Sequence, residues 1–142
     1  MEQNYKNHRR LVTGYHKVLA LLLLIGFIGS IVNLSNSFQS DNLYSATLLV
    51  FLFICLMFIT FYVRSFPLKA QDRTIRAEEN FRHYILTGKQ ISPNLSMSQI
   101  IALRFAPDEE FAELAQRAEK ENLTDKAIKQ IIKRWKADHY RV

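Results

Sequence analysis

Between Val18 and Val63 the chain has no lysine or arginine and a single acid, Asp41. All 19 basic residues of the 142-residue sequence lie outside this stretch. The overall values, 49% hydrophobic residues and a net charge of +6, therefore average an apolar region at residues 18–63 with charged regions on either side of it. The residues outside the uncharged stretch are too few for a second large core, which argues against a large enzyme with a deep pocket.

The sequence also lacks the signatures of catalytic and metal sites. Its one cysteine, Cys55, lies in an apolar run, so no internal disulfide can form. The 4 histidines are scattered without an H-x-x-x-H pair, and neither a glycine-rich phosphate loop nor a G-x-S-x-G elbow occurs. The acids of Asp108–Glu110 fit the first turn of a helix better than a catalytic cleft. We expect no enzyme activity, no cofactor and no metal site.

Two uncharged apolar runs are present, at residues 18–34 and 43–63. As helices they would extend about 25 and 32 Å, against a hydrocarbon core of about 30 Å. Residues 35–42 are polar or turn-forming and can reverse the chain. The pattern predicts a two-span transmembrane hairpin over residues 18–63, between an N-terminal segment at 1–17 and a domain at 64–142.

The basic residues predict how the hairpin is oriented. They flank both spans and are missing from the loop: Lys6, Arg9, Arg10 and Lys17 come before, and Arg64, Lys69, Arg73 and Arg76 after. By the positive-inside rule both termini are cytoplasmic, which gives a multi-pass protein of the cell membrane. The same residues can interact with anionic lipid headgroups at the cytoplasmic face.

A cleaved secretory signal over residues 1–37 is the alternative for the first span. Arg9 and Arg10 would form its basic region, and Ser35–Ser37 supplies small residues for cleavage. The length of the apolar run and the second span that follows it favour the hairpin.

Small residues give the first span one face that a second helix can approach closely. They are Gly26, Gly29 and Ser30. This face can pack the two spans together or pair two subunits, and packing within the hairpin is the simpler interpretation.

The domain at 64–142 is predicted to be helical. Pro67 is expected to kink or restart the chain, and a helix should run from about Leu68 to Thr87, with Gly88 ending it. Small and aromatic residues at spacings of four and three line one side of this helix: Ala70, Thr74, Ala77, Phe81 and Tyr84. We interpret this stripe as a surface that packs against the later helices or against a second copy.

Three shorter helices are expected to follow, which makes the protein all-α. Ser96 with Gln99 forms a capping box for the first, and Met97, Ile100, Ile101 and Phe105 should face inward. A second helix over Asp108–Glu121 has an inward face of Phe111, Leu114, Ala115 and Ala118. Thr124 caps a third, whose inward face is Ile128, Ile131, Ile132 and Trp135.

Four sequence blocks resemble a family of small bacterial two-span membrane proteins classed as a domain of unknown function. They are NYKNH at Asn4–His8, QDRTIRAEENFRHYILTGK at Gln71–Lys89, SQIIALRFAPDEE at Ser98–Glu110 and IKQIIKRWKADHYRV at Ile128–Val142. The resemblance implies two spans, a helical cytoplasmic tail and a bacterial cytoplasmic membrane. It implies no activity, ligand or catalytic residue.

The predicted function is therefore that of a non-enzymatic, membrane-anchored helical module that binds a protein partner or a second copy. Arginine and tryptophan are enriched at interface hot spots, so the candidate partner surface is Arg104, Trp135, Asp138 and Arg141. Arg104 can also pair with an acid, and Trp135 can serve as a core residue. A membrane-tethered nucleic-acid-binding regulator is the alternative, since the last helix is basic, but acids on the preceding helix oppose it.

Overall fold

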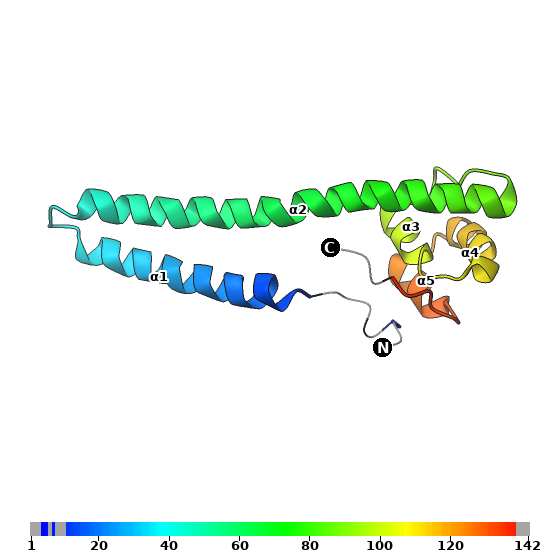
Figure 1. Ribbon diagram of the computed structural model, residues 1–142, viewed down its shortest axis with the longest axis horizontal. Helices are drawn as coiled ribbons and strands as arrows, with labels where there is room; N and C mark the ends of the chain where they lie inside the picture. The colour runs from blue at the N-terminus through cyan, green and yellow to red at the C-terminus, as the bar shows by residue number, and fades with distance from the viewer. Residues whose placement is uncertain (1–3, 6, 8–10, 139–142) are drawn as a thin grey trace. The chain divides into compact units, whose positions relative to one another are not determined.

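A computed structural model describes residues 4, 5, 7 and 11–138 of the chain (Figure 1). Within these residues the protein has five α-helices, one short π-helix and no β-strand. The chain forms two compact units that meet in sequence between Phe66 and Pro67. The expectation of an all-helical protein is confirmed.

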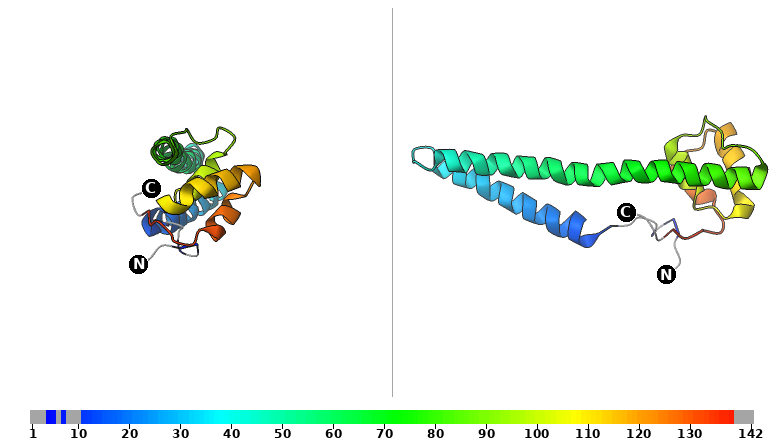
Figure 2. Two further views of the ribbon diagram at one scale, coloured as in Figure 1. Left: turned by 90° about the vertical axis from the view of Figure 1, so that its right-hand side faces the viewer. Right: turned by 45° about the horizontal axis from the view of Figure 1, so that its top comes forward.

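The first unit is a helical hairpin. It consists of the π-helix Gly14–Leu19, helix α1 over Ala20–Asn36 and the first part of helix α2, which begins at Leu43. Residues 37–42 reverse the chain, so that α1 and the start of α2 run side by side (Figure 2). Ser37 N–H donates to the Leu34 carbonyl at 3.1 Å and Ser40 N–H to the Ser37 carbonyl at 3.1 Å, which satisfies backbone groups at the turn.

Contacts between side chains of one helix and backbone of the other join the hairpin. The ring of Phe53 lies so close to Gly26 that a Cβ there would collide with it, whereas a Cβ at Gly29 would meet nothing within 4 Å. The Tyr15 hydroxyl donates to the Thr60 carbonyl. Ser30 is also buried, and its hydroxyl donates to the Phe27 carbonyl of its own helix at 2.7 Å. Ser30 is thus a buried position and Gly26 a half-buried one, whereas Gly29 faces open space.

In the part of the chain that the structure describes, two helices are long and apolar enough to cross a membrane, Gly14–Asn36 with 23 residues and α2 with 45. Only 6% of the most apolar window of each is buried. Large side chains are accordingly exposed along both helices: Leu22 by 60%, Phe51 by 63% and Phe58 by 60%. A core helix of a soluble protein would bury these side chains.

Helix α2 continues from Leu43 to Thr87 with Pro67 inside it, so the chain does not restart a new helix at Pro67. Proline removes one N–H donor and crowds the carbonyl four residues earlier, but its fixed φ is compatible with a helix. At about 1.5 Å per residue α2 is roughly 68 Å long, about twice the thickness of a hydrocarbon core. The helix ends at Gly88, whose φ of +71° suits glycine, as the sequence predicts.

The second unit consists of the last part of α2 and three short helices: α3 over Met97–Leu103, α4 over Asp108–Lys120 and α5 over Asp125–Ile131. Helix α3 contacts both α4 and α5. The largest fully buried side chains of the second unit are Ile100, Leu103, Phe105, Phe111 and Ile128. Their burial supplies the hydrophobic stabilisation of this unit.

The local signals for α3 and α4 are confirmed. Ser96 and Gln99 form a complete capping box, with Gln99 N–H donating to the Ser96 hydroxyl at 3.3 Å and Ser96 N–H to the Gln99 amide oxygen at 2.7 Å. The predicted inward face of α4, Phe111, Leu114, Ala115 and Ala118, is buried throughout.

The last helix is shorter than its apolar spacing predicts. It ends at Ile131, so Trp135 lies in a non-helical segment and not on the helix. Backbone donors beyond the helix bond elsewhere: Lys133 N–H reaches the Glu110 carboxylate at 3.1 Å and Lys136 N–H the Phe105 carbonyl at 2.8 Å. These long-range bonds replace the local ones that would have extended the helix.

The stripe on the 68–87 segment does not pack against the later helices. Its members, Ala70, Thr74, Ala77, Phe81 and Tyr84, are all exposed. The opposite face contains Ile75, Glu79, Arg82 and His83, and it contacts α4 through Arg82 with Asp108 and His83 with Phe111. The face of α2 that is buried is therefore determined by its ion pairs and hydrogen bonds to other segments, and not by the spacing of its apolar residues.

We predict that Gly26→Ala destabilises the hairpin relative to Gly29→Ala. Both substitutions improve helix propensity equally, but only the first forces the Phe53 ring to move. The expected difference is about 1–3 kcal/mol, measured by SDS-driven unfolding in mixed micelles with far-UV circular dichroism. Phe53→Ala in the Gly26→Ala background should remove most of it, and equal stability of the two alanine variants would contradict the packing.

Candidate partner-binding surface

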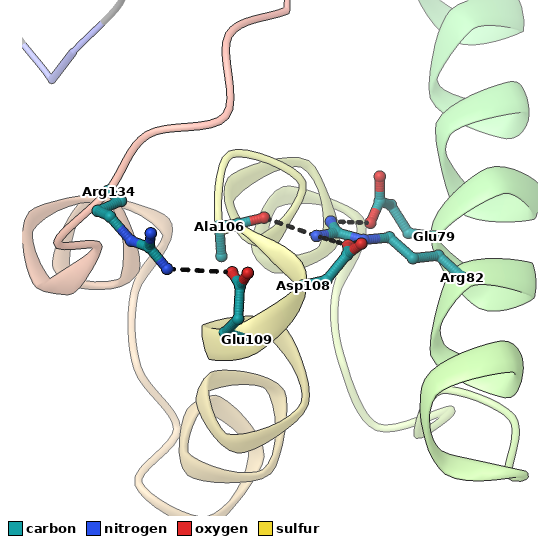
Figure 3. Close-up of polar contacts among 6 residues, drawn as sticks. All are labelled: Glu79, Arg82, Ala106, Asp108, Glu109 and Arg134. Atoms are coloured by element: carbon teal, nitrogen blue, oxygen red, sulfur yellow. Dashed lines mark hydrogen bonds and ion pairs between the residues drawn. The ribbon is translucent and has the colours of Figure 1, made fainter.

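Arg82 connects α2 to the corner between α3 and α4 (Figure 3). Its guanidinium contacts the Asp108 carboxylate at 2.5 Å, the Glu79 carboxylate at 3.1 Å and the Ala106 carbonyl at 2.8 Å. Its central carbon also lies 4.3 Å from the centre of the Phe111 ring. The planar fork of an arginine can serve several acceptors at once, so this side chain fixes the corner against α2.

Neighbouring polar residues extend the same contact region. The Asn80 side-chain oxygen accepts from Ile91 N–H at 2.9 Å, and His83 Nδ1 lies 2.8 Å from the Lys89 carbonyl. The His83 ring meets the Phe111 ring edge to face at 6.0 Å. The face of α2 turned toward the unit is therefore mostly polar, and its groups are satisfied by bonds to other elements.

Glu79 is 8% exposed, and this burial raises the pKa of its carboxyl, an effect that the hydrogen bond and charge of Arg82 oppose. Burial disfavours the ionised form because the carboxylate loses water. On the surface, the Ser92 and Asn94 side chains lower the pKa of Glu119 and Lys129 lowers that of Asp125, because they donate to the ionised forms.

A half-open cavity of about 360 Å³ lies beside Glu79. Its wall contains acidic and basic side chains as well as uncharged ones: Gln71, Thr74, Ile75, Glu78, Glu79, Arg104, Lys136, Ala137 and Asp138. Because charges of both signs face the same space, the cavity presents no field of a single sign. Such a lining suits a polar protein segment better than a polyanion.

Three of the four residues expected to form a partner surface gather at this cavity or next to it. Arg104 pairs with Asp138 at 3.0 Å, and Trp135 packs on Phe105 with 4.9 Å between ring centres. Arg104 is only 9% exposed, and its Nε makes no hydrogen bond within the described residues. Asp138 and Trp135 are partly exposed, and Arg141 lies outside the described residues.

The outer face of α2 is the most apolar exposed surface of the second unit. Phe81 is 66% exposed, Tyr84 55% and Ile85 65%. The sequence identifies this stripe as a packing surface but does not show that it faces outward. Glu79 and Arg82 lie three residues apart on the opposite face, but such a spacing is equally typical of an exposed helix pair, so the sequence contained no signal that this face is buried.

A search of the described residues finds no group of three or more histidine, cysteine, aspartate or glutamate side chains that could hold a metal ion. The acids of the α4 first turn instead contact cations and a backbone donor. Asp108 contacts Arg82, Glu109 contacts Arg134 at 3.3 Å (Figure 3), and Glu110 accepts from Lys133 N–H.

We predict that Arg82→Met destabilises the second unit by about 3 kcal/mol, because it leaves a buried carboxylate at Glu79 without its partner. Arg82→Lys should restore only part of the loss, since a single ammonium cannot reach all three acceptors. Unfolding is followed by the fluorescence of Trp135, the 1 tryptophan in the chain. Arg117→Ala, which removes an exposed pair with Glu121, is the control, and an equal loss there would contradict the role of Arg82.

The raised pKa of Glu79 predicts a pH dependence with a definite sign. The folded state binds this proton more tightly than the unfolded state, so Glu79 makes stability fall as pH rises from about 4.5 through the folded-state pKa. Glu119 and Asp125, whose pKa values are lowered, act in the opposite sense and at lower pH. Glu79→Gln should flatten the fall above pH 4.5 in Trp135-monitored unfolding, and an unchanged pH profile would contradict this assignment.

Comparison with known proteins agrees with the resemblance drawn from the sequence blocks. No curated protein and no solved structure matches the chain. One family profile, described as a family of unknown function (DUF6526), matches residues 1–142. The chain therefore belongs to the DUF6526 family over its whole length.

Proposed function

We propose that the protein is an integral, multi-pass protein of the cell membrane, in which the hairpin is the anchor and the second unit is a non-enzymatic module that binds a protein. The observation that carries this proposal is the exposed apolar surface of the first unit. Each of its two long helices has an 18-residue window that is only 6% buried. In water that surface would be strongly unfavourable, whereas a hydrocarbon core accommodates it.

Backbone geometry supports the same proposal. In a bilayer every backbone polar group needs a partner within the protein, and two helices joined by a six-residue turn meet that need. The turn carries its own hydrogen bonds, and its side chains Gln39 and Ser40 are exposed. A polar turn of this kind is suited to the membrane surface opposite the basic flanks.

The charge distribution supports cytoplasmic termini. Four basic residues follow closely after the apolar part of α2: Arg64, Lys69, Arg73 and Arg76. The turn between the two apolar helices has no basic residue. Basic residues are retained on the cytoplasmic side and favour contact with anionic headgroups there. The charge distribution therefore supports a cytoplasmic location for the second unit.

A binding role for the second unit is supported by how its ionisable groups are used. Arg82, Arg104, Arg117, Lys129 and Arg134 all lie in ion pairs within the unit. A catalytic acid or base needs instead to face a substrate cleft. Large apolar side chains, meanwhile, remain exposed on the outer face of α2.

Nucleic-acid binding is less well supported. Two of the basic residues near the chain end pair with acids, Lys129 with Asp125 at 3.1 Å and Arg134 with Glu109 at 3.3 Å. Those pairs weaken the positive field that binding to phosphates needs. Helix α5 has only 7 residues, which is short for a recognition helix.

We predict that a thiol at Gln39 is external and a thiol at Gln90 cytoplasmic. Both positions are exposed, and Cys55 is first replaced by alanine so that the new thiol is the only one. A membrane-impermeant maleimide applied to intact cells should label Gln39→Cys, and should label Gln90→Cys only after permeabilisation.

A fractionation control and the opposite labelling pattern make this experiment decisive. Alkaline carbonate extraction should leave the protein in the membrane fraction, and release into the supernatant would refute the membrane anchor. Labelling of Gln90→Cys, but not Gln39→Cys, in intact cells would reverse the orientation. Ser37 is a poor position for the thiol because it is buried and its hydroxyl donates to the Asn33 carbonyl.

A further inference from the structure

We propose that the outer face of α2 pairs with the same face of a second copy, as a short parallel coiled coil over residues 70–84. This inference rests on the proposed function, because insertion in one membrane with one topology makes two copies of α2 emerge in the same direction. It names the partner of the module as the protein itself.

The spacing of the exposed stripe is that of a coiled-coil seam. Ala70, Thr74, Ala77, Phe81 and Tyr84 alternate by four and three residues, as the d and a positions of a heptad do. All five side chains are exposed. The face that α2 turns toward its own unit holds Ile75, Glu79 and Arg82, which occupy b and f positions opposite the seam. Folding of the unit therefore leaves the seam open.

The charges beside the seam match a parallel, in-register pair. With Thr74 and Phe81 at a positions, Arg73 is at g and Glu78 is at the following e. In a parallel coiled coil a g residue meets the e residue five positions later in the other helix. Arg73 of one copy therefore meets Glu78 of the other, and symmetry produces the pair twice.

Arg73 and Glu78 are both available for this contact. Both are exposed, and none of the ion pairs within the described residues includes either of them. Lys69 and Arg76, the nearest other basic residues, occupy c positions away from the seam. The complementary pair is therefore specific to the parallel register.

Side-chain sizes along the seam also fit close pairing. Ala70 and Ala77 allow the helices to approach, and Phe81 and Tyr84 supply the large apolar contacts beyond them, with Ile85 at the adjacent e position. Two heptads form only a weak pair in dilute solution. Confinement to one membrane raises the effective concentration of the second copy and offsets this weakness.

Homotypic disulfide cross-linking of the full-length protein in native membranes tests the pairing. Ala70→Cys, Ala77→Cys and Tyr84→Cys, each without Cys55, place thiols at d positions, where parallel helices bring them within the reach of a disulfide. Lys69→Cys and Arg76→Cys are matched controls on exposed c positions of the same helix. We expect oxidation to give covalent dimer at all three seam positions and several-fold less at the two controls.

Two sets of further variants identify the cause of cross-linking. In the Ala77→Cys protein, Phe81→Glu should reduce the dimer to the level of Arg76→Cys, while Trp135 fluorescence confirms that the second unit stays folded. Arg73→Glu alone and Glu78→Arg alone should each lower the yield several-fold. The double variant with both charges reversed should recover it, which loss of general stability cannot explain.

Other results would overturn the pairing. Equal yields at seam and control positions would do so, as would dimer at Ala77→Cys alone, which indicates antiparallel crossing. Adducts to a different protein in place of the homodimer would assign the face to a heterologous partner. Carbonate extraction of the same membranes separates the two proposals: a retained protein without seam-specific dimer refutes only the pairing, and a released protein refutes the membrane anchor.

Discussion

The guanidinium of Arg82 determines which face of α2 is turned toward the rest of the second unit. It neutralises Glu79 on its own helix and reaches the Ala106 carbonyl and the Asp108 carboxylate at the corner between α3 and α4. Burying a carboxylate is tolerable only when a partner of opposite charge is held close to it. Because Arg82 meets that requirement on one side of the helix, Phe81 and Tyr84 are left on the other side.

The two units differ in which kind of side chain they expose and which kind they bury. In residues 11–66 many large apolar side chains are exposed, and the buried positions hold small residues: Ser30, Ser37 and Ala46. In the second unit the relation is the ordinary one, with Phe105, Phe111 and Ile128 fully buried. The average composition of the chain hides this reversal, which is the physical basis for treating the first unit as a membrane anchor.

Local signals in the sequence predict much of the fold. The capping box at Ser96 and the glycine stop at Gly88 depend on residues close together in the chain, and both are present as expected. The end of α5 and the buried face of α2 depend on distant partners: Glu110 accepts the Lys133 N–H, and Arg82 reaches Asp108. Apolar periodicity contains no information about those partners. For the same reason Arg104 could be expected to pair with an acid, but its burial could not be predicted.

The open seam of α2 also bears on how the second unit behaves in isolation. A fragment beginning at Pro67 would lack the apolar spans yet still expose Phe81, Tyr84 and Ile85 along one helix. Contiguous apolar surface of this kind lowers colloidal stability in water. Removing residues 1–66 would therefore not by itself yield a well-behaved soluble domain, and polar substitutions on the outer face would be needed for work in dilute aqueous buffer.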